Sequence, residues 1–406
     1  MLTLQPAPRP QRPAEPRIGL ALAGGGPLGA FYEIGALHAL AEACEGLDLT
    51  ALDSYVGVSS GAIVAGALAN GFDTADMGVV FIENAAVEFP LTPGLLLQPA
   101  FSEYLARAAR APGLVTAVAR QYIAAPRQGL MAAALGPLGR LLPTGFFDNA
   151  PFERFLARLF SSAGRSNDFR RLPKRLYVAA TDLDSGTEAR FGGPGLEDVP
   201  ISRAIQASTA LPGLYPPVRI RGHSYVDGAL LRTMHASLAL EAGATLVLCV
   251  NPLVAFDAFA TGRRRASLAD SGLPVIMSQT FRALIQSRMQ VGMAAYRGRF
   301  PHSDMLLFEP DRSDEEMFFA NVFRYKDRHR LVEHSYDRTR RQLRARAAAL
   351  RPLLARHGLA LRMDVLNDRH RRFSHAVKAR SHHFAPATGE LHAGLDRLEQ
   401  LLDTAY

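Results

Sequence analysis

The sequence predicts an α/β fold with a mostly parallel sheet, because short apolar segments alternate with segments of helical periodicity. Residues 17–23 form a short apolar run that ends in glycines, which is typical of a buried strand. Residues 28–44 follow with apolar side chains at helical spacing. The same alternation continues along the chain, and we expect strands at 53–58, 176–181 and 244–250 and a small-residue helix at 60–70.

Length and charge restrict the class of protein. The chain has 406 residues, a formal net charge of +8 and two cysteines. A basic balance favours anionic surfaces, either nucleic acid or acidic lipid. We find no recognised nucleic-acid motif and no aromatic residues interleaved with the basic ones, so no specific nucleic-acid partner is expected. Cys44 and Cys249 lie far apart without metal or redox spacing, which indicates structural thiols in a reducing compartment.

Composition along the chain suggests three parts. Residues 1–15 are rich in proline and are expected to be a flexible lead-in, and residues 16–255 are expected to form the main α/β domain. Residues 256–406 are expected to be a mainly helical, basic C-terminal extension. Within the main domain, residues 89–147 form an apolar, arginine-bearing insertion, which we interpret as a lid, a membrane-facing segment or an ordinary packed insertion. We see neither a secretory signal nor a stretch long and apolar enough to span a membrane, so a cytoplasmic protein is expected, with peripheral membrane binding as an alternative.

The segment Gly57-Val58-Ser59-Ser60-Gly61 fits the G-x-S-x-G pattern of a nucleophile elbow. Ser59 is therefore the candidate nucleophile, with Gly57 and Gly61 permitting the tight strand-to-helix turn. The pattern alone is weak, because it can arise by chance in a chain with 34 glycines. The apolar strand before it and the small-residue helix after it strengthen the interpretation.

A glycine loop precedes this elbow by about thirty residues. Gly24, Gly25, Gly26 and Gly29 follow the first predicted strand, and their main-chain N–H groups are candidates for an oxyanion hole at a helix start. The same spacing also fits a dinucleotide-binding fingerprint, which requires an acidic residue at the end of the next strand. Asp53 lies before that strand, not after it, so this alternative is disfavoured.

A serine nucleophile needs a base. Asp227 is the strongest candidate, since it follows a strand-like stretch and precedes Gly228 and Ala229 in a loop. An Asp-Gly turn with no catalytic role has the same sequence pattern. His223, four residues earlier, is an alternative base that sequence spacing does not exclude.

These motifs in this order resemble the patatin-like phospholipase family. The similarity extends over about residues 16–255 and includes the stretches 179–186 and 207–218. The resemblance implies a three-layer α/β/α fold in which Ser59 attacks an ester carbonyl and Asp227 accepts its proton. It also implies that the N–H groups of Gly25 and Gly26 hold the oxyanion. No cofactor or metal is implied.

One position departs from the family pattern. Members usually carry arginine or lysine in the glycine loop, where this chain has Leu28. Because the glycine loop, Ser59 and Asp227 are all present, we still expect a serine lipid acyl hydrolase that acts on phospholipids or other lipid esters. The alternative is a catalytically weak lipid- or membrane-binding scaffold on the same fold, for which Leu28 is the main support. The lipid class and the oligomeric state are not indicated by the sequence.

Overall fold

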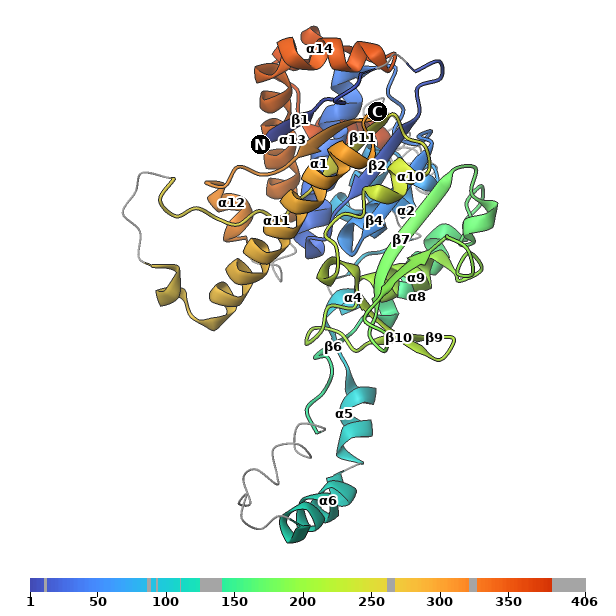
Figure 1. Ribbon diagram of the computed structural model, residues 1–406, viewed down its shortest axis with the longest axis vertical. Coiled ribbons are helices and arrows are strands. Elements are labelled where there is room, and N and C mark those ends of the chain that lie inside the picture. The colour runs from blue at the N-terminus through green and yellow to red at the C-terminus, as the bar shows by residue number, and fades with distance from the viewer. Residues whose placement is uncertain are drawn as a thin grey trace, which may run out of the picture.

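A nine-stranded mixed sheet organises the chain in a computed structural model (Figure 1). The structure describes residues 1–10, 13–85, 89–92, 94–109, 111–124, 141–260, 267–320 and 327–381. The strand order is β1-β12-β11-β2-β4-β7-β10-β9, with β8 paired to β7. The five central strands run parallel, and antiparallel strands complete both ends. The strands are β1 (Leu2–Gln5), β2 (Ile18–Leu22), β4 (Ser54–Val58), β7 (Arg175–Asp182), β8 (Glu188–Phe191), β9 (Val218–Ile220), β10 (His223–Asp227), β11 (Leu246–Val250) and β12 (Asp304–Phe308).

Helices cover both faces of this sheet, so the three-layer α/β/α expectation is confirmed. Alternate residues of β2 show the division: Leu20 and Leu22 pack on one side, and Ala21 packs on the other. The first side is covered by α1 (Gly26–Ala43), α2 (Ser60–Ala69), α8 (Ala150–Phe160), α9 (Ile201–Ser208) and α13 (Arg328–Ala345). The second side is covered by α10 (Ser237–Glu241) and the C-terminal half of α11 (Leu273–Arg299).

Short elements complete the described chain. They are the helices α3 (Thr74–Met77), α4 (Gly94–Leu97), α5 (Phe101–Ala108), α6 (Ala111–Ala124), α12 (Glu315–Phe318), α14 (Ala347–Arg356), α15 (Met363–Asn367) and α16 (Phe373–Ser381). The π-helical turn Gly78–Glu83 and the 3-10 turns Phe169–Arg171, Gly228–Leu230 and Leu268–Ser271 join them. Two small two-stranded sheets pair β3 (Cys44–Glu45) with β13 (Ala360–Leu361), and β5 (Gln98–Pro99) with β6 (Phe147–Asp148).

The expected partition of the chain differs from the structure at both ends. Residues 2–5 are not a flexible lead-in, because they form β1 and pair with β12 at the sheet edge. The boundary expected at residue 255 separates no structural unit, because β12 lies in register between β11 and β1. Helix α13 also belongs to the core, since Gly35 of α1 packs directly against Ser335. The segment after residue 255 therefore completes the sheet and one of its helical layers.

Pro352 lies inside α14 and does not end that helix. Arg346 separates α13 from α14. Proline removes the hydrogen bond to the carbonyl four residues before it. That carbonyl belongs to Ala348, which is exposed, so water can satisfy it.

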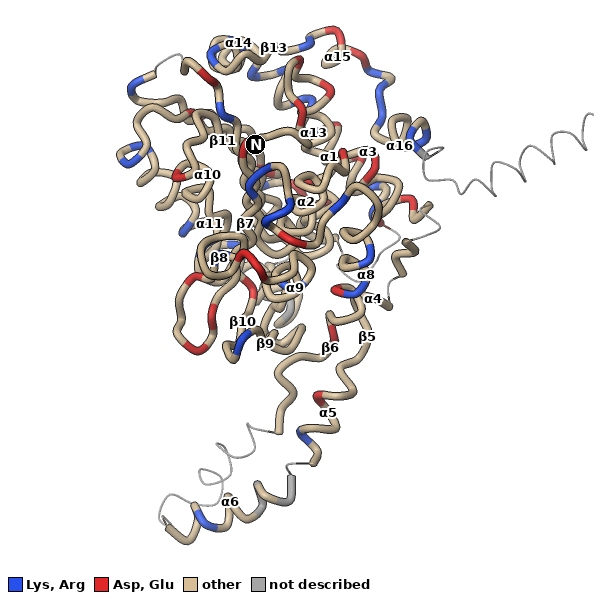
Figure 2. Tube along the Cα trace, turned by 90° about the vertical axis from the view of Figure 1, so that its right-hand side faces the viewer, with Lys and Arg blue, Asp and Glu red and all other residues tan. Residues whose placement is uncertain are grey.

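The insertion at 89–147 forms an arm that extends away from the sheet (Figure 1). Its described part contains α4, β5, α5, α6 and β6, and residues 125–140 lie outside the described residues. Figure 2 shows few charged residues along α5 and α6. Among the described helices, none combines the length and the apolar character needed to cross a bilayer.

Candidate active site

Ser59 lies at the turn between β4 and α2, as the elbow pattern predicts. Its backbone has φ 53° and ψ −121°, a conformation that costs a non-glycine residue about 1–3 kcal/mol. Flanking glycines make this turn possible, since a Cβ at Gly57 would lie 2.4 Å from the Cα of Ala62. A Cβ at Gly61 would lie 2.6 Å from the carbonyl oxygen of Leu22. The serine is thus held at the end of a parallel strand and the start of a helix, where the helix dipole favours negative charge.

The Ser59 side chain interacts with the carboxyl group of Asp227 and acts to lower its pKa. Asp227 ends β10 and is buried, and its Oδ1 accepts the N–H of Ala229 at 2.9 Å. Burial raises the pKa of Asp227 to about 6, although the contacts with Ala229 and Ser59 act to lower it. The structure therefore brings together the predicted nucleophile and the predicted base, with no histidine between them.

Three further hydrogen bonds hold the backbones of Ser59 and Asp227 in place. The N–H of Ser59 donates to Oγ of Ser208 at 2.8 Å, and this hydroxyl donates in turn to the carbonyl of Ala179 at 2.6 Å. The N–H of Asp227 donates to the carbonyl of Ala210 at 3.0 Å. The segment around Ser208 thus holds the backbones of both residues. Its sequence was part of the family resemblance, but nothing in it indicated that Ser208 anchors the elbow.

Gly24 brings the glycine loop against the same pair. A Cβ at Gly24 would lie 3.0 Å from Cβ of Ser59 and 3.2 Å from Cβ of Ala229. Helix α1 begins at Gly26, so the N–H groups of its first turn have no acceptor within the helix. Gly26 has φ 63°, and a Cβ at Gly25 would lie 2.4 Å from Pro252. The loop therefore presents main-chain donors beside Ser59, in a conformation that side chains would obstruct.

Leu28 lies in the first turn of α1 and is buried in the hydrophobic core, which also contains Phe31 and Tyr32 of the same helix. The site of the usual basic residue is thus an apolar packing position in this chain. The helix start keeps its N–H donors whichever side chain stands at residue 28.

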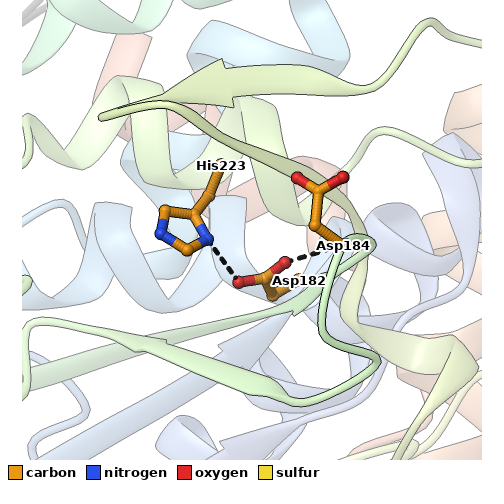
Figure 3. Close-up of side chains that lie close together, drawn as sticks. All are labelled: Asp182, Asp184 and His223. Atoms are coloured by element: carbon orange, nitrogen blue, oxygen red, sulfur yellow. Dashed lines mark hydrogen bonds and ion pairs between the residues drawn. The ribbon is translucent and has the colours of Figure 1, made fainter.

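His223 lies elsewhere and contacts a different carboxylate (Figure 3). Its Nδ1 lies 2.9 Å from Oδ2 of Asp182, and its ring is more than half exposed. Oδ1 of Asp182 accepts the N–H groups of Asp184 and Ser185, and Oδ2 of Asp184 accepts the N–H of Ser224. Asp182, Asp184 and His223 have the residue types of a metal site. Their oxygens are nevertheless engaged in joining the turn after β7 to β10, which is a structural role.

The base of the arm is attached next to the Asp227 loop. The N–H groups of Phe146 and Phe147 donate to the carbonyls of Gly213 and Leu214, at 3.2 and 2.8 Å. The hydroxyl of Tyr215 donates to the carbonyl of Leu96 at 2.9 Å. This loop follows Ala210, whose carbonyl holds Asp227, so the arm and the dyad share one support.

Comparison with known proteins gives a consistent assignment. The family model for patatin-like phospholipases matches residues 20–240. Uncharacterised NTE family proteins of Mycobacterium bovis and Mycobacterium tuberculosis are each 27% identical over 238 residues, which is 58% of this chain. The chain spans only 30% of the length of these relatives.

Solved structures with detectable similarity are distant. VipD from Legionella pneumophila aligns with a TM-score of 0.34 and 16% identity, over 80% of this chain and 67% of VipD. The ExoU–SpcU complex from Pseudomonas aeruginosa aligns with a TM-score of 0.27 and 18% identity, over 73% of this chain and 53% of that one. The family model covers more than half of the chain, including the glycine loop, the elbow and Asp227. The chain belongs to the patatin-like phospholipase family.

Proposed function

We propose that this protein is a serine lipid acyl hydrolase in which Ser59 and Asp227 form the catalytic dyad. The observation that carries the proposal is the interaction of the Ser59 side chain with the buried Asp227 carboxyl group, next to the glycine loop. Oγ of Ser59 attacks the ester carbonyl carbon while its proton passes to Asp227. The N–H groups of Gly25 and Gly26 stabilise the oxyanion, and each such donor contributes about 3 kcal/mol. The alcohol leaves with a proton, and water then hydrolyses the acyl-enzyme.

A dyad without histidine requires the carboxylate to be a stronger base than an ordinary aspartate. Burial of Asp227 supplies this property, since it raises the pKa of the group to about 6. At neutral pH the group is still mostly ionised and ready to accept a proton. Its position relative to Ser59 is fixed by the N–H of Ala229 and the carbonyl of Ala210.

The test is hydrolysis of a soluble p-nitrophenyl butyrate and of phospholipid in mixed micelles. We expect Ser59→Ala and Asp227→Asn each to reduce kcat by about a thousandfold or more, since members of a catalytic unit fail together. Ser185→Ala and Asp184→Asn are matched controls in the turn after β7, and both should keep wild-type rates. Full activity in either dyad variant would refute the dyad, and full activity in both would refute the proposed mechanism.

The alternative is a lipid-binding scaffold without turnover. Its support was Leu28, but that side chain packs in the core and leaves the donor loop intact. Retention of the strained elbow also favours catalysis, because a strained backbone conformation is a cost that a scaffold does not need. Lipid binding with no hydrolysis of either substrate by the wild type would favour the scaffold.

We also propose that the arm contacts the lipid surface that holds the substrate. Phe101, Leu105 and Ile123 are exposed on α5 and α6. They belong to a segment whose base is joined to the loop beside Asp227. An apolar, sparsely charged arm is suited to insertion between headgroups.

A further inference from the structure

Helix α11 has an inverted amphipathic arrangement over its N-terminal half. Its side toward the protein carries polar residues, and these bind the main chain of the loop after β11. Nε2 of Gln279 donates to the carbonyl of Phe256 at 2.7 Å, and Oε1 of Gln279 accepts the N–H of Phe256 at 3.1 Å. Oε1 of Gln286 accepts the N–H of Ala255 at 3.1 Å. Arg282 lies between them over the ring of Phe318.

The opposite side of the same helix is apolar and exposed. Large hydrophobic residues recur at helical spacing along it over about 27 Å, given 1.5 Å per residue. They are Leu273, Ile276, Met277, Phe281, Leu284 and Val291, with exposed fractions from 40% to 70%. A helix of a globular protein normally turns this stripe toward the core. Here Met289, Met293 and Tyr296 of the C-terminal half pack against the core.

Charge indicates what covers this surface. Helix α11 contains four arginines over its 27 residues and has neither aspartate nor glutamate. Arg288 is exposed at the border of the stripe. A long apolar face that has a cation at its border, on a helix without carboxylates, complements an anionic bilayer surface.

The helix is joined to the candidate active site through two loops. Nη1 of Arg288 donates to the carbonyl of Leu230 at 2.7 Å, in the turn directly after Asp227. Helix α11 is also attached, through Gln279 and Gln286, to the loop that follows Pro252. Pro252 itself packs against Gly25 of the glycine loop. A surface bound along α11 would therefore lie beside the loops that frame the dyad.

We infer that the exposed face of α11 is a docking surface for an anionic lipid bilayer, on which the helix lies parallel to the interface. The inference rests on the proposed function, since such a surface presents ester substrate to Ser59. Docking buries the stripe between lipid headgroups, and the positive charge of the helix favours an anionic surface. The arm and α11 are then two separate contacts with one substrate phase.

The test compares Leu284→Glu with Leu183→Glu, both in a Ser59→Ala background so that the lipid is not consumed. The two leucines are matched, because Leu284 is 52% exposed and Leu183, in the turn after β7, is 53% exposed. Partition is measured by flotation with vesicles of phosphatidylglycerol and phosphatidylcholine, and with phosphatidylcholine alone. We expect Leu284→Glu to lower partition onto anionic vesicles roughly tenfold or more, and Leu183→Glu to change it less than twofold. Val291→Glu repeats the test at a position of the stripe closer to the C-terminal end of α11.

Several outcomes would overturn the inference. Equal partition of wild type, Leu284→Glu and Leu183→Glu would show that α11 does not dock. A wild-type dimer that Leu284→Glu converts to a monomer in sedimentation equilibrium would assign the face to a second copy of this chain.

Hydrolysis of p-nitrophenyl butyrate separates this inference from the proposed function. Leu284→Glu in the otherwise native chain should keep the wild-type rate on this soluble ester. Docking through α11 by a wild type that lacks ester hydrolysis would refute the hydrolase while leaving the docking surface supported. Loss of the soluble activity in Leu284→Glu would place α11 in the site rather than on a lipid surface.

Discussion

At the scale of single residues, the environment of Asp227 decides the chemistry of the site. An aspartate in water is ionised above about pH 4, and it is too weak a base to activate a serine efficiently. Burial at the end of β10 raises the pKa of Asp227 to about 6. The hydrogen bond from the N–H of Ala229 holds the carboxylate in place at the same time.

This shift predicts how activity depends on pH. Asp227 accepts a proton only when ionised, so kcat/KM should rise about tenfold per pH unit below 6 and level off above it. The measurement is hydrolysis of p-nitrophenyl butyrate from pH 4.5 to 8, with Ser59→Ala as the blank at each pH. Circular dichroism at each pH checks that the protein remains folded. A rate that is constant between pH 5 and 7 would contradict Asp227 as the base.

Leu28 allows a second prediction at this scale. Replacing it by arginine would restore the residue type usual in the family, but the side chain would enter the core beside Phe31. An unpaired buried guanidinium costs several kcal/mol, so Leu28→Arg should lower the free energy of unfolding by about 3 kcal/mol or more without raising activity. Urea denaturation and ester hydrolysis measure the two effects, with Leu28→Met as the volume-conserving control. A more active variant of unchanged stability would show that position 28 does reach the site.

At the scale of elements, the sequence predicted the strands and the helix next to the candidate site better than the strands at the sheet edge. Strands β2 and β4 and helix α2 lie within one or two residues of the expected ranges, because buried parallel strands are short apolar runs with glycine at their ends. Strands β1 and β12 were not predicted. Each is short and pairs with distant strands: β1 pairs with β12 across about 300 positions, and β12 also pairs with β11 across 58 positions. Local pattern does not carry that information.

The candidate site divides in the same way. The serine, the glycine loop and the aspartate lie in motifs, so the sequence indicated them. Ser208 and Pro252 support the elbow and the glycine loop through contacts across 149 and 227 positions, and no local spacing marks them. The inverted polarity of α11 was missed for a related reason. Periodicity shows that a helix has two faces, but not which of them the protein covers.

The contact between α2 and β2 gives a prediction at the element scale. A Cβ at Gly61 would meet the carbonyl oxygen of Leu22 at 2.6 Å, and backbone cannot yield as a flexible side chain does. Gly61→Ala should therefore reduce the free energy of unfolding by about 1–3 kcal/mol, and displacement of the elbow should lower kcat. Gly292→Ala in α11 is the matched control, since its Cβ meets only the Tyr296 hydroxyl, at 3.9 Å. That control should be neutral or stabilising by up to about 1 kcal/mol.

At the scale of the whole molecule, two strands far apart in the sequence, β1 and β12, complete one side of the sheet that carries the candidate site. Strand β1 is the edge, β12 joins it to β11, and α13 packs on α1, the helix that starts at the glycine loop. The C-terminal part of the chain therefore acts on the candidate site through the position of α1. A variant ending at residue 255 would expose the edge of β11 and one face of α1.

Asp304, at the start of β12, links these distant parts of the chain. Its carboxylate accepts the N–H of Ala7 at 2.8 Å and contacts Arg356 and His357 at 2.8 and 2.6 Å. These hydrogen bonds and ion pairs hold the pKa of Asp304 below its usual range, against the opposing effect of burial. A lowered carboxyl pKa contributes stability above the unfolded value, near 4, and this contribution is lost as the pH falls through the folded value.

Asp304→Asn should therefore destabilise the whole fold rather than a local segment. Removing one partner of a buried ion pair costs about 3–5 kcal/mol, so we expect a loss of about that size at pH 7 in one cooperative urea transition. The difference from wild type should shrink as the pH falls below about 4, because the unfolded chain then binds a proton that the native carboxylate does not bind until its lower pKa is reached. Asp364→Asn is the control, since that carboxylate is exposed and pairs only with the neighbouring Arg362. A local loss of hydrogen-exchange protection around residues 356–357, with global stability unchanged, would show that the C-terminal layer unfolds independently of the sheet.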